Sequence, residues 1–118
     1  PLSLKSAIKN FDKIESNKSN KYLLIGDMLE LGSHSKKLHK SIAPIINQTN
    51  IDKVFVKGKL ASIIFKNISK AKKGRILFNK SQIIELIRKD LNNNDYLMIK
   101  ASLATGFNEI VKNLKRLS

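Results

Sequence analysis

Short apolar segments alternate with amphipathic segments along the whole chain. Four runs have little or no polar alternation, as in strands that are buried on both faces of a parallel sheet. Between and around them, apolar residues recur at helical spacing. The predicted strands are 22–25, 53–56, 75–78 and 96–99, and the predicted helices are 3–15, 35–48, 60–68, 81–91 and 105–117.

The order of these segments predicts an α/β fold. Strands that alternate with helices, joined by short loops, build a parallel sheet with right-handed crossovers and helices on both faces. We therefore expect residues 1–118 to form a single domain, a three-layer Rossmann-like sandwich around a mainly parallel sheet of about four strands. Pro44 lies inside the second predicted helix and is expected to kink or divide it.

Composition restricts the class of protein further. The chain has 118 residues and no Cys, which excludes disulfides and thiolate metal sites. No apolar run approaches the roughly 20 residues of a membrane-spanning helix, and no signal peptide is visible. A cytoplasmic location is expected. The chain opens on Pro1 and not on Met, from which we expect an excised piece of a longer protein.

The net charge of +14 allows two interpretations. A strongly basic chain can bind nucleic acid, so a basic nucleic-acid-binding α/β module is one alternative. However, 20 of the 23 basic residues are Lys, spread over the whole length, and only three are Arg, the usual reader of bases. Together with abundant Ile and Asn, this is typical of an A/T-rich coding sequence. We therefore expect neither nucleic acid nor a membrane as a partner.

The stretch 21–39 contains the first candidate site. Asp27 directly follows the first strand and Gly26, and Glu30 lies in the same loop. Ligands of open α/β sheets bind at the carboxyl ends of the strands, where two carboxylates can bind Mg²⁺ through water, a ribose hydroxyl or a substrate ammonium. The alternative is that Asp27 caps a turn and that Glu30 is solvated.

A second candidate site follows the last strand. Lys100 and Ser102, with the start of a helix at 105–106, suit a carboxylate or a phosphate; the alternative is a capping loop with a surface Lys. The segment 57–59, Lys-Gly-Lys, is a weaker candidate. No phosphate-binding G-x-x-x-x-G-K-[ST] or G-x-G-x-x-G motif occurs, so the chain alone is not expected to activate ATP.

The two histidines form a poor metal pair. His34 and His39 are five residues apart, off the i, i+4 spacing of a helical pair, and Cys partners are absent. No metal site is therefore expected in the chain. Ser35 precedes His39 by one helical turn, which predicts a local hydrogen bond that positions the loop.

One run of residues resembles a known family. The segment 26–39, G-D-M-L-E-L-G-S-H-S-K-K-L-H, is similar to the signature of the C-terminal domain of the Mur ligases, in which G-D-M-x-E-L-G precedes Ser and His four apart. Ser35 and His39 match that pair. The segment 96–102 resembles the strand that leads to Lys-Gly-Ser in this family, with Ala101 in place of the glycine.

The resemblance covers the whole chain in order and implies a function. It implies the third domain of an ATP-dependent ligase of peptidoglycan biosynthesis, of the branch that adds D-alanyl-D-alanine to UDP-N-acetylmuramoyl-tripeptide. In that family this domain closes over a central domain that holds ATP and Mg²⁺, and it binds the incoming dipeptide. The implied partners are the central and N-terminal domains, D-Ala-D-Ala and the UDP-linked peptide, in a monomeric enzyme.

The resemblance also implies which residues form the site. None is implied to be catalytic within this domain, so the isolated chain is expected to be inactive and to hold no cofactor. A third interpretation, a stand-alone flavodoxin-like regulatory domain, fits the missing Met less well. The implied residues are Asp27, Glu30, Lys100 and Ser102 in the substrate cleft between the domains, and Gly26, Gly32, Ser35 and His39 as residues that position the first loop.

Overall fold

The computed structural model describes residues 2–27 and 35–101 of the chain. Its centre is a four-stranded sheet in the order β3-β2-β1-β4, and all three strand pairs are parallel. This confirms the predicted α/β class and the number of strands. The strands are β1 (Lys21–Gly26), β2 (Lys53–Lys57), β3 (Lys73–Ile76) and β4 (Tyr96–Lys100).

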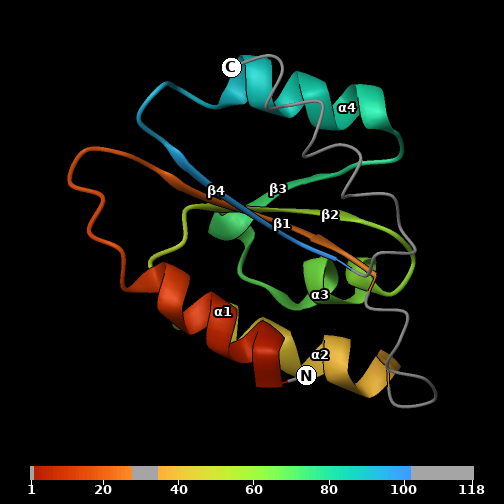
Figure 1. The fold of residues 1–118 in the computed structure, drawn as a ribbon. Coiled ribbons are helices and arrows are strands. Elements are labelled where there is room, and N and C mark those ends of the chain that lie inside the picture. Colours follow the sequence, from red (N-terminus) through yellow and green to blue (C-terminus); the bar gives the residue numbers. More distant parts are fainter. Residues whose placement is uncertain (1, 28–34, 102–118) are drawn as a thin grey trace.

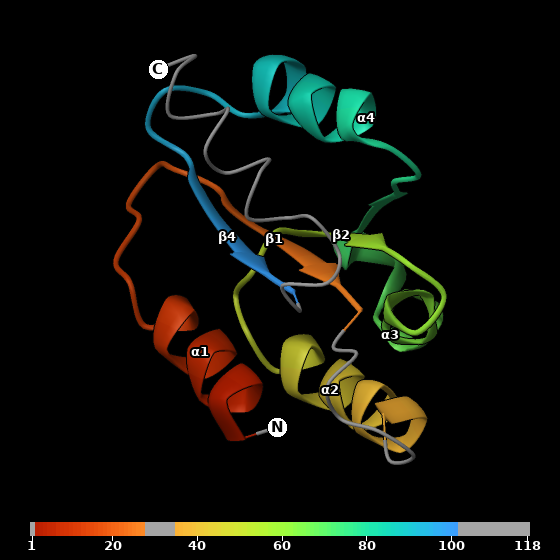
Figure 2. The same ribbon diagram turned by 45° about the vertical axis from the view of Figure 1, so that its right-hand side comes forward.

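Helices cover both faces of the sheet and complete the three layers. Figures 1 and 2 show α1, α2 and α3 on one face and α4 on the other. Their bounds are α1 (Leu2–Asp12), α2 (Ser35–Asn47), α3 (Ala61–Asn67) and α4 (Lys80–Glu85), with a 3₁₀ turn η2 (Lys70–Lys72) before β3 and a π turn η3 (Leu86–Asp90) after α4.

The sheet separates two hydrophobic cores. Alternate residues of a strand point to opposite faces, so β1, whose six residues are all buried, contributes to both cores. One core lies under α1, α2 and α3, and the other lies under α4 and η3. The first contains Leu23, Ile25, Val54 and Val56 with Leu4, Ile8, Ile42, Ile46 and Ile64; the second contains Tyr22, Leu24, Phe55, Leu77, Ile83 and Leu86.

The third strand lies two residues earlier than predicted. Gly74, which precedes the predicted strand, is inside β3, where the strand packs closely against the ring of Phe55. A Cβ built on Gly74 would lie 2.6 Å from Cε1 of Phe55. Leu77 remains in the core and donates its N–H to the carbonyl of Val56 at 2.7 Å. Phe78, predicted in the strand, is 73% exposed.

Two helix boundaries also differ from the prediction. α1 ends at Asp12 and not at residue 15. α4 begins at Lys80, one residue before the predicted start, and is capped by Asn79, whose Oδ1 accepts the N–H of Gln82 at 2.9 Å. The predicted fifth helix, 105–117, lies outside the described residues.

Pro44 does not divide α2, so that alternative of the prediction was wrong. The helix runs without interruption from Ser35 to Asn47 with Pro44 inside it. A proline removes one backbone hydrogen bond, that to the carbonyl four residues earlier, which belongs to Lys40. Both residues are exposed, so water can satisfy this carbonyl.

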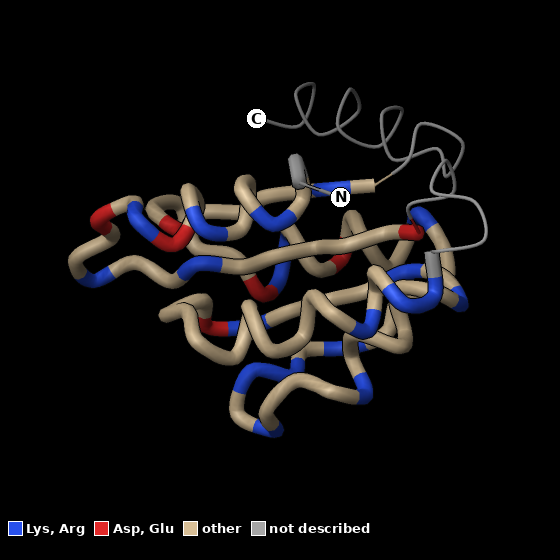
Figure 3. Tube along the Cα trace, turned by 90° about the horizontal axis from the view of Figure 1, so that it is seen from below, with Lys and Arg blue, Asp and Glu red and all other residues tan. Residues whose placement is uncertain are grey.

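Several lysines donate hydrogen bonds within the domain, and these roles help to interpret the net positive charge of the chain. Nζ of Lys21 donates to the carbonyl of Asp12 at 2.6 Å, at the end of α1. Nζ of Lys72 donates to the carbonyls of Thr49 and Ile51, at 2.7 and 2.8 Å. Figure 3 shows basic residues on all sides of the described trace and few acidic ones. This distribution agrees with the interpretation that the charge is general and not one binding patch.

The contact between Gly74 and Phe55 gives a test of the fold. Gly74→Ala should lower the free energy of unfolding by about 1–3 kcal/mol, because the added methyl group overpacks the core against the ring. Urea unfolding followed by circular dichroism measures this. In a Phe55→Leu background the same change should cost clearly less, and an equal cost in both backgrounds would contradict the contact.

Candidate functional site

The carboxyl ends of the strands form the edge where the sequence predicts a site. In this parallel sheet all strands end at the same edge, the usual ligand edge of open α/β folds. The register pairs Ile25 of β1 with Lys100 of β4, and Gly26 of β1 with Lys57 of β2. Asp27, the next residue after β1, therefore lies between the ends of β2 and β4. We call this edge the carboxyl rim.

Asp27 is held by the turn that connects β2 to α3. Its Oδ1 accepts the N–H of Ala61, the first residue of α3, at 2.7 Å. The first N–H groups of a helix lack partners within the helix, and the N-cap residue Leu60 makes no side-chain capping bond. Asp27 thus supplies from another loop the acceptor that α3 needs. A carboxylate has two oxygens that can accept several hydrogen bonds, so this bond does not exclude a ligand.

Gly58 packs against the same carboxylate. Its φ is +119°, a conformation that residues with a Cβ rarely adopt. A Cβ built there would lie 2.4 Å from Oδ1 of Asp27. The carbonyl of Gly58 accepts both the N–H of Ser62 at 3.0 Å and its hydroxyl at 2.7 Å. We call residues 57–62 the 57–62 turn.

Asp27 and Lys100 lie on one side of the carboxyl rim. Lys100 is aligned with Ile25, which belongs to the core under α1, α2 and α3. Lys57 is aligned with Gly26, one residue further along, so its side chain points to the opposite face. Asp27 in turn contacts Ala61 of α3. The structure therefore places an acidic and a basic candidate that are far apart in the sequence on the same face, at the ends of adjacent strands.

A pocket that the sequence did not predict adjoins Asp27. It has a volume of about 280 Å³ and lies between the ends of β2 and β3. Gly58, which touches Asp27, is also part of its wall. Sequence reasoning missed the pocket because it placed Phe78 in a buried strand. The Lys-Gly-Lys segment was its only sequence signal. The lining residues are Lys57, Gly58, Lys59, Ser62, Ile76, Leu77 and Phe78.

The other predicted site residues are only partly described. Gly26 is the last residue of β1, as the sequence suggests. His39 lies on α2 with 1% of its surface exposed, so it is a buried part of the domain. Glu30, Gly32, Ser102 and the side chain of Ser35 lie outside the described residues, and so does the predicted Ser35–His39 hydrogen bond.

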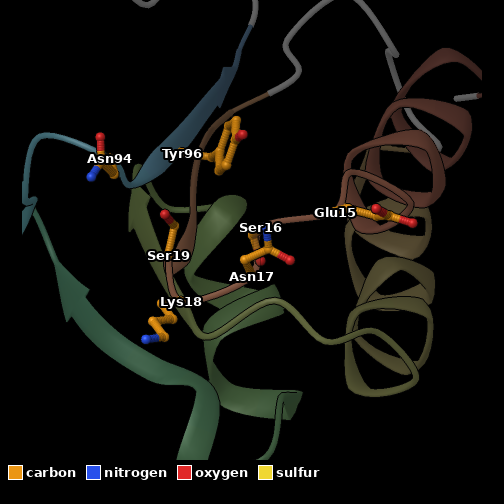
Figure 4. Close-up of a pocket in the computed structure, with 7 residues that line it drawn as sticks. All are labelled: Glu15, Ser16, Asn17, Lys18, Ser19, Asn94 and Tyr96. Atoms are coloured by element: carbon orange, nitrogen blue, oxygen red, sulfur yellow. The ribbon is translucent and has the colours of Figure 1, made fainter.

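A larger pocket lies at the opposite edge of the sheet. Its volume is about 810 Å³, and it is lined by residues 15–19 with Asn94 and Tyr96. In Figure 4 the charged groups of Glu15 and Lys18 lie on different sides of the pocket and point away from each other. Charges that diverge in this way cannot hold one ligand group together, so this pocket is a weaker candidate than the carboxyl rim.

The groups on the carboxyl rim can bind and orient a charged ligand. Asp27 offers a carboxylate, and Lys57, Lys59 and Lys100 offer ammonium groups. Within residues 2–27 and 35–101, no three His, Asp or Glu side chains gather as metal ligands, and no helix is long and apolar enough to span a bilayer. These features define an α/β domain of Rossmann-like architecture with a polar rim at the carboxyl ends of its strands.

Comparison with known families identifies which α/β domain this is. The family described as "Mur ligase, glutamate ligase domain" matches residues 1–103. This match spans most of the chain, so the chain belongs to that family. The resemblance that was based on the segment 26–39 is thereby confirmed, and the match favours a ligase domain over a nucleic-acid-binding module.

Individual relatives of the chain share the same protein name. The chain is 33% identical, over 97% of its length, to the UDP-N-acetylmuramoyl-tripeptide–D-alanyl-D-alanine ligase of Bacillus subtilis. It is 27% identical, over 94% of its length, to the ligase of that name from Rickettsia prowazekii. The chain covers 25% and 24% of these two proteins, respectively. It therefore spans about a quarter of the length of the relatives it matches.

Two solved structures share the fold. The MurF ligase of Thermotoga maritima, in complex with ADP, matches all of this chain with a TM-score of 0.75 at 22% identity. MurF of Acinetobacter baumannii matches 97% of this chain with a TM-score of 0.73 at 19% identity. The chain covers 27% and 25% of those proteins. At this level of identity the likeness concerns the fold alone.

The bond between Asp27 and α3 predicts different stabilities for two substitutions. Asp27→Ala should lower the free energy of unfolding by about 1 kcal/mol, as expected for the loss of a helix-capping acceptor. Asp27→Asn keeps an acceptor oxygen in the same place and should cost much less. Urea unfolding of the three proteins gives this comparison. Equal stability of Asp27→Ala and the unsubstituted chain would contradict the capping role.

Proposed function

We propose that the chain acts as the C-terminal domain of a ligase that joins D-alanyl-D-alanine to UDP-N-acetylmuramoyl-tripeptide, with consumption of ATP, during synthesis of the peptidoglycan precursor. The observation that carries the proposal is the 33% identity to the Bacillus subtilis ligase, which extends over 97% of the chain. Identity along the whole domain, and not at one motif, supports a shared role.

The proposed reaction forms an amide bond between two substrates. ATP phosphorylates the terminal carboxylate of the tripeptide, and the amine of D-Ala-D-Ala attacks the acyl phosphate and displaces phosphate. Water would hydrolyse this intermediate, so the site must close around it. In this proposal the domain contributes the carboxyl rim as one wall of the site, and the other domains of the ligase bring ATP and the UDP-linked peptide.

The charges on the carboxyl rim suit the incoming dipeptide. D-Ala-D-Ala has an amine at one end and a carboxylate at the other, and an extended dipeptide spans at most about 7 Å. Lys100 is aligned with Ile25, two residues before Asp27, on a neighbouring strand about 4.8 Å away. We assign Asp27 to the amine end and Lys100 to the carboxylate end. Glu30 and Ser102 complete the proposed cleft, and Gly32, Ser35 and His39 position its first loop.

In this proposal another domain of the ligase binds Mg²⁺. Hard cations such as Mg²⁺ are bound through carboxylates together with substrate phosphates, and on the described part of the rim Asp27 is a single carboxylate already engaged by Ala61. We therefore derive no step through a metal on this chain. A cytoplasmic location, supported by the proposed dependence on ATP and by the absence of Cys, and a monomeric state are part of the same proposal.

Removal of the charge of Asp27 tests its proposed role in the full-length ligase that carries this chain. Asp27→Asn should lower kcat/KM for D-Ala-D-Ala by about 10- to 100-fold, the loss of one charged hydrogen bond, with little change in the KM for ATP. Steady-state assays of phosphate release measure both. Glu85→Gln, on the exposed side of α4, is the matched control and should leave the rate unchanged. A normal rate for Asp27→Asn would mean that Asp27 only caps α3 and does not take part in binding the dipeptide.

The isolated chain should neither form the amide nor hydrolyse ATP. It has no nucleotide-phosphate loop by sequence, and we assign activation of the tripeptide to other domains. A coupled assay for ADP, with the purified 118-residue chain and all three substrates, checks this. ATP turnover by the chain alone would contradict the division of labour between the domains.

A further inference from the structure

We infer that Gly58 is a positioning residue for the ligation reaction and acts through Asp27. Because Gly58 has no Cβ, the 57–62 turn can lie directly against the carboxylate of Asp27 and hold it at the carboxyl rim. The inference rests on the proposed role of Asp27 in binding the dipeptide. It adds a residue in the turn after a different strand, 31 positions away from Asp27.

One turn both binds the carboxylate of Asp27 and lies close to it. The N–H of Ala61 donates to Oδ1 at 2.7 Å. The backbone at Gly58 is so near that an added Cβ would meet all three carboxylate atoms, at 2.4 Å (Oδ1), 2.5 Å (Cγ) and 2.8 Å (Oδ2). The carboxylate therefore keeps its present position only while residue 58 has no side chain.

Two hydrogen bonds stabilise the turn itself. The carbonyl of Gly58 accepts the N–H and the hydroxyl of Ser62, at 3.0 and 2.7 Å. These bonds fix the distance between the residue that stops the carboxylate and the start of the helix that donates to it. With φ at +119°, Gly58 also adopts a conformation that an L-residue with a Cβ enters only at a cost. Two independent features thus require glycine here.

A substitution at Gly58 should therefore move Asp27 as well as strain the backbone. A Cβ 2.4 Å from Oδ1 forces the carboxylate to rotate away, and a displacement of about 1 Å in a group that orients a substrate can cost about 100-fold in rate. The strain at φ, by contrast, is local and does not depend on residue 27. These two effects can be separated, because only the first disappears when the carboxylate is removed.

The test is a double-substitution cycle in the full-length ligase that carries this chain. Gly58→Ala should lower kcat/KM for D-Ala-D-Ala tenfold or more, mainly by a higher KM for the dipeptide, with the KM for ATP little changed. In an Asp27→Ala background the same change should have no further effect on kcat/KM. The rates are measured at a temperature where circular dichroism shows every variant to be folded.

Gly74→Ala is the matched control. It also places a Cβ at 2.6 Å from a neighbouring side chain, that of Phe55, but on β3 and away from Asp27. It should reduce stability and leave kcat/KM unchanged. If Gly74→Ala and Gly58→Ala lower the activity equally, or if the Gly58→Ala loss persists in the Asp27→Ala background, the inference is wrong and Gly58 is only a structural glycine.

The cycle also separates the inference from the proposed function. A normal rate for Asp27→Ala alone would overturn the role of Asp27, whatever Gly58 does. A lowered rate for Asp27→Ala with a normal rate for Gly58→Ala would overturn only the inference. Should Gly58→Ala not fold, Ser62→Ala loosens the same turn without strain at φ. Its expected result is a two- to fivefold rise in the KM for the dipeptide that vanishes in the Asp27→Ala background, and an unchanged KM would count against the inference.

Discussion

The structure depends on the burial of β1 between two parallel neighbours. All six residues of this strand are buried, and both of its edges are bonded, to β2 on one side and to β4 on the other. A strand in this position has no solvent-facing side, so a shift of its register by one residue would move every side chain into the wrong core. The place where β1 ends is therefore fixed, and with it the position of Asp27.

The sequence was a good guide to the parts of the fold that depend on hydrophobic pattern. The runs at 22–25, 53–56 and 96–99 are strands because they must be apolar on both faces, and that requirement is visible residue by residue. The run at 75–78 predicted the wrong bounds because β3, an edge strand, begins at Lys73 and includes Gly74, which packs against Phe55, a partner 19 residues away. A contact over that distance leaves no local signal.

The same distinction applies to the site. Asp27 and Lys100 were identifiable because each follows an apolar run, and parallel strands end at the same edge. The contacts of Asp27 with Gly58 and Ala61 were not identifiable, because nothing near residue 27 indicates which later turn folds against it. Two interpretations of Asp27 that looked like alternatives in the sequence, a cap and a ligand group, turn out to be compatible. Its bond to α3 orients the carboxylate that the proposed reaction uses.

The register between β1 and β4 has a mechanical consequence. Ile25 and Lys100 are aligned in neighbouring strands of the sheet, and Asp27 follows two residues after Ile25, so the backbone at Asp27 and at Lys100 is carried by the same sheet. Any rigid-body rotation of the domain must carry the two charges together along one arc. A binding partner on another domain would meet both in a single event, with the backbone that carries them already in place before contact is made.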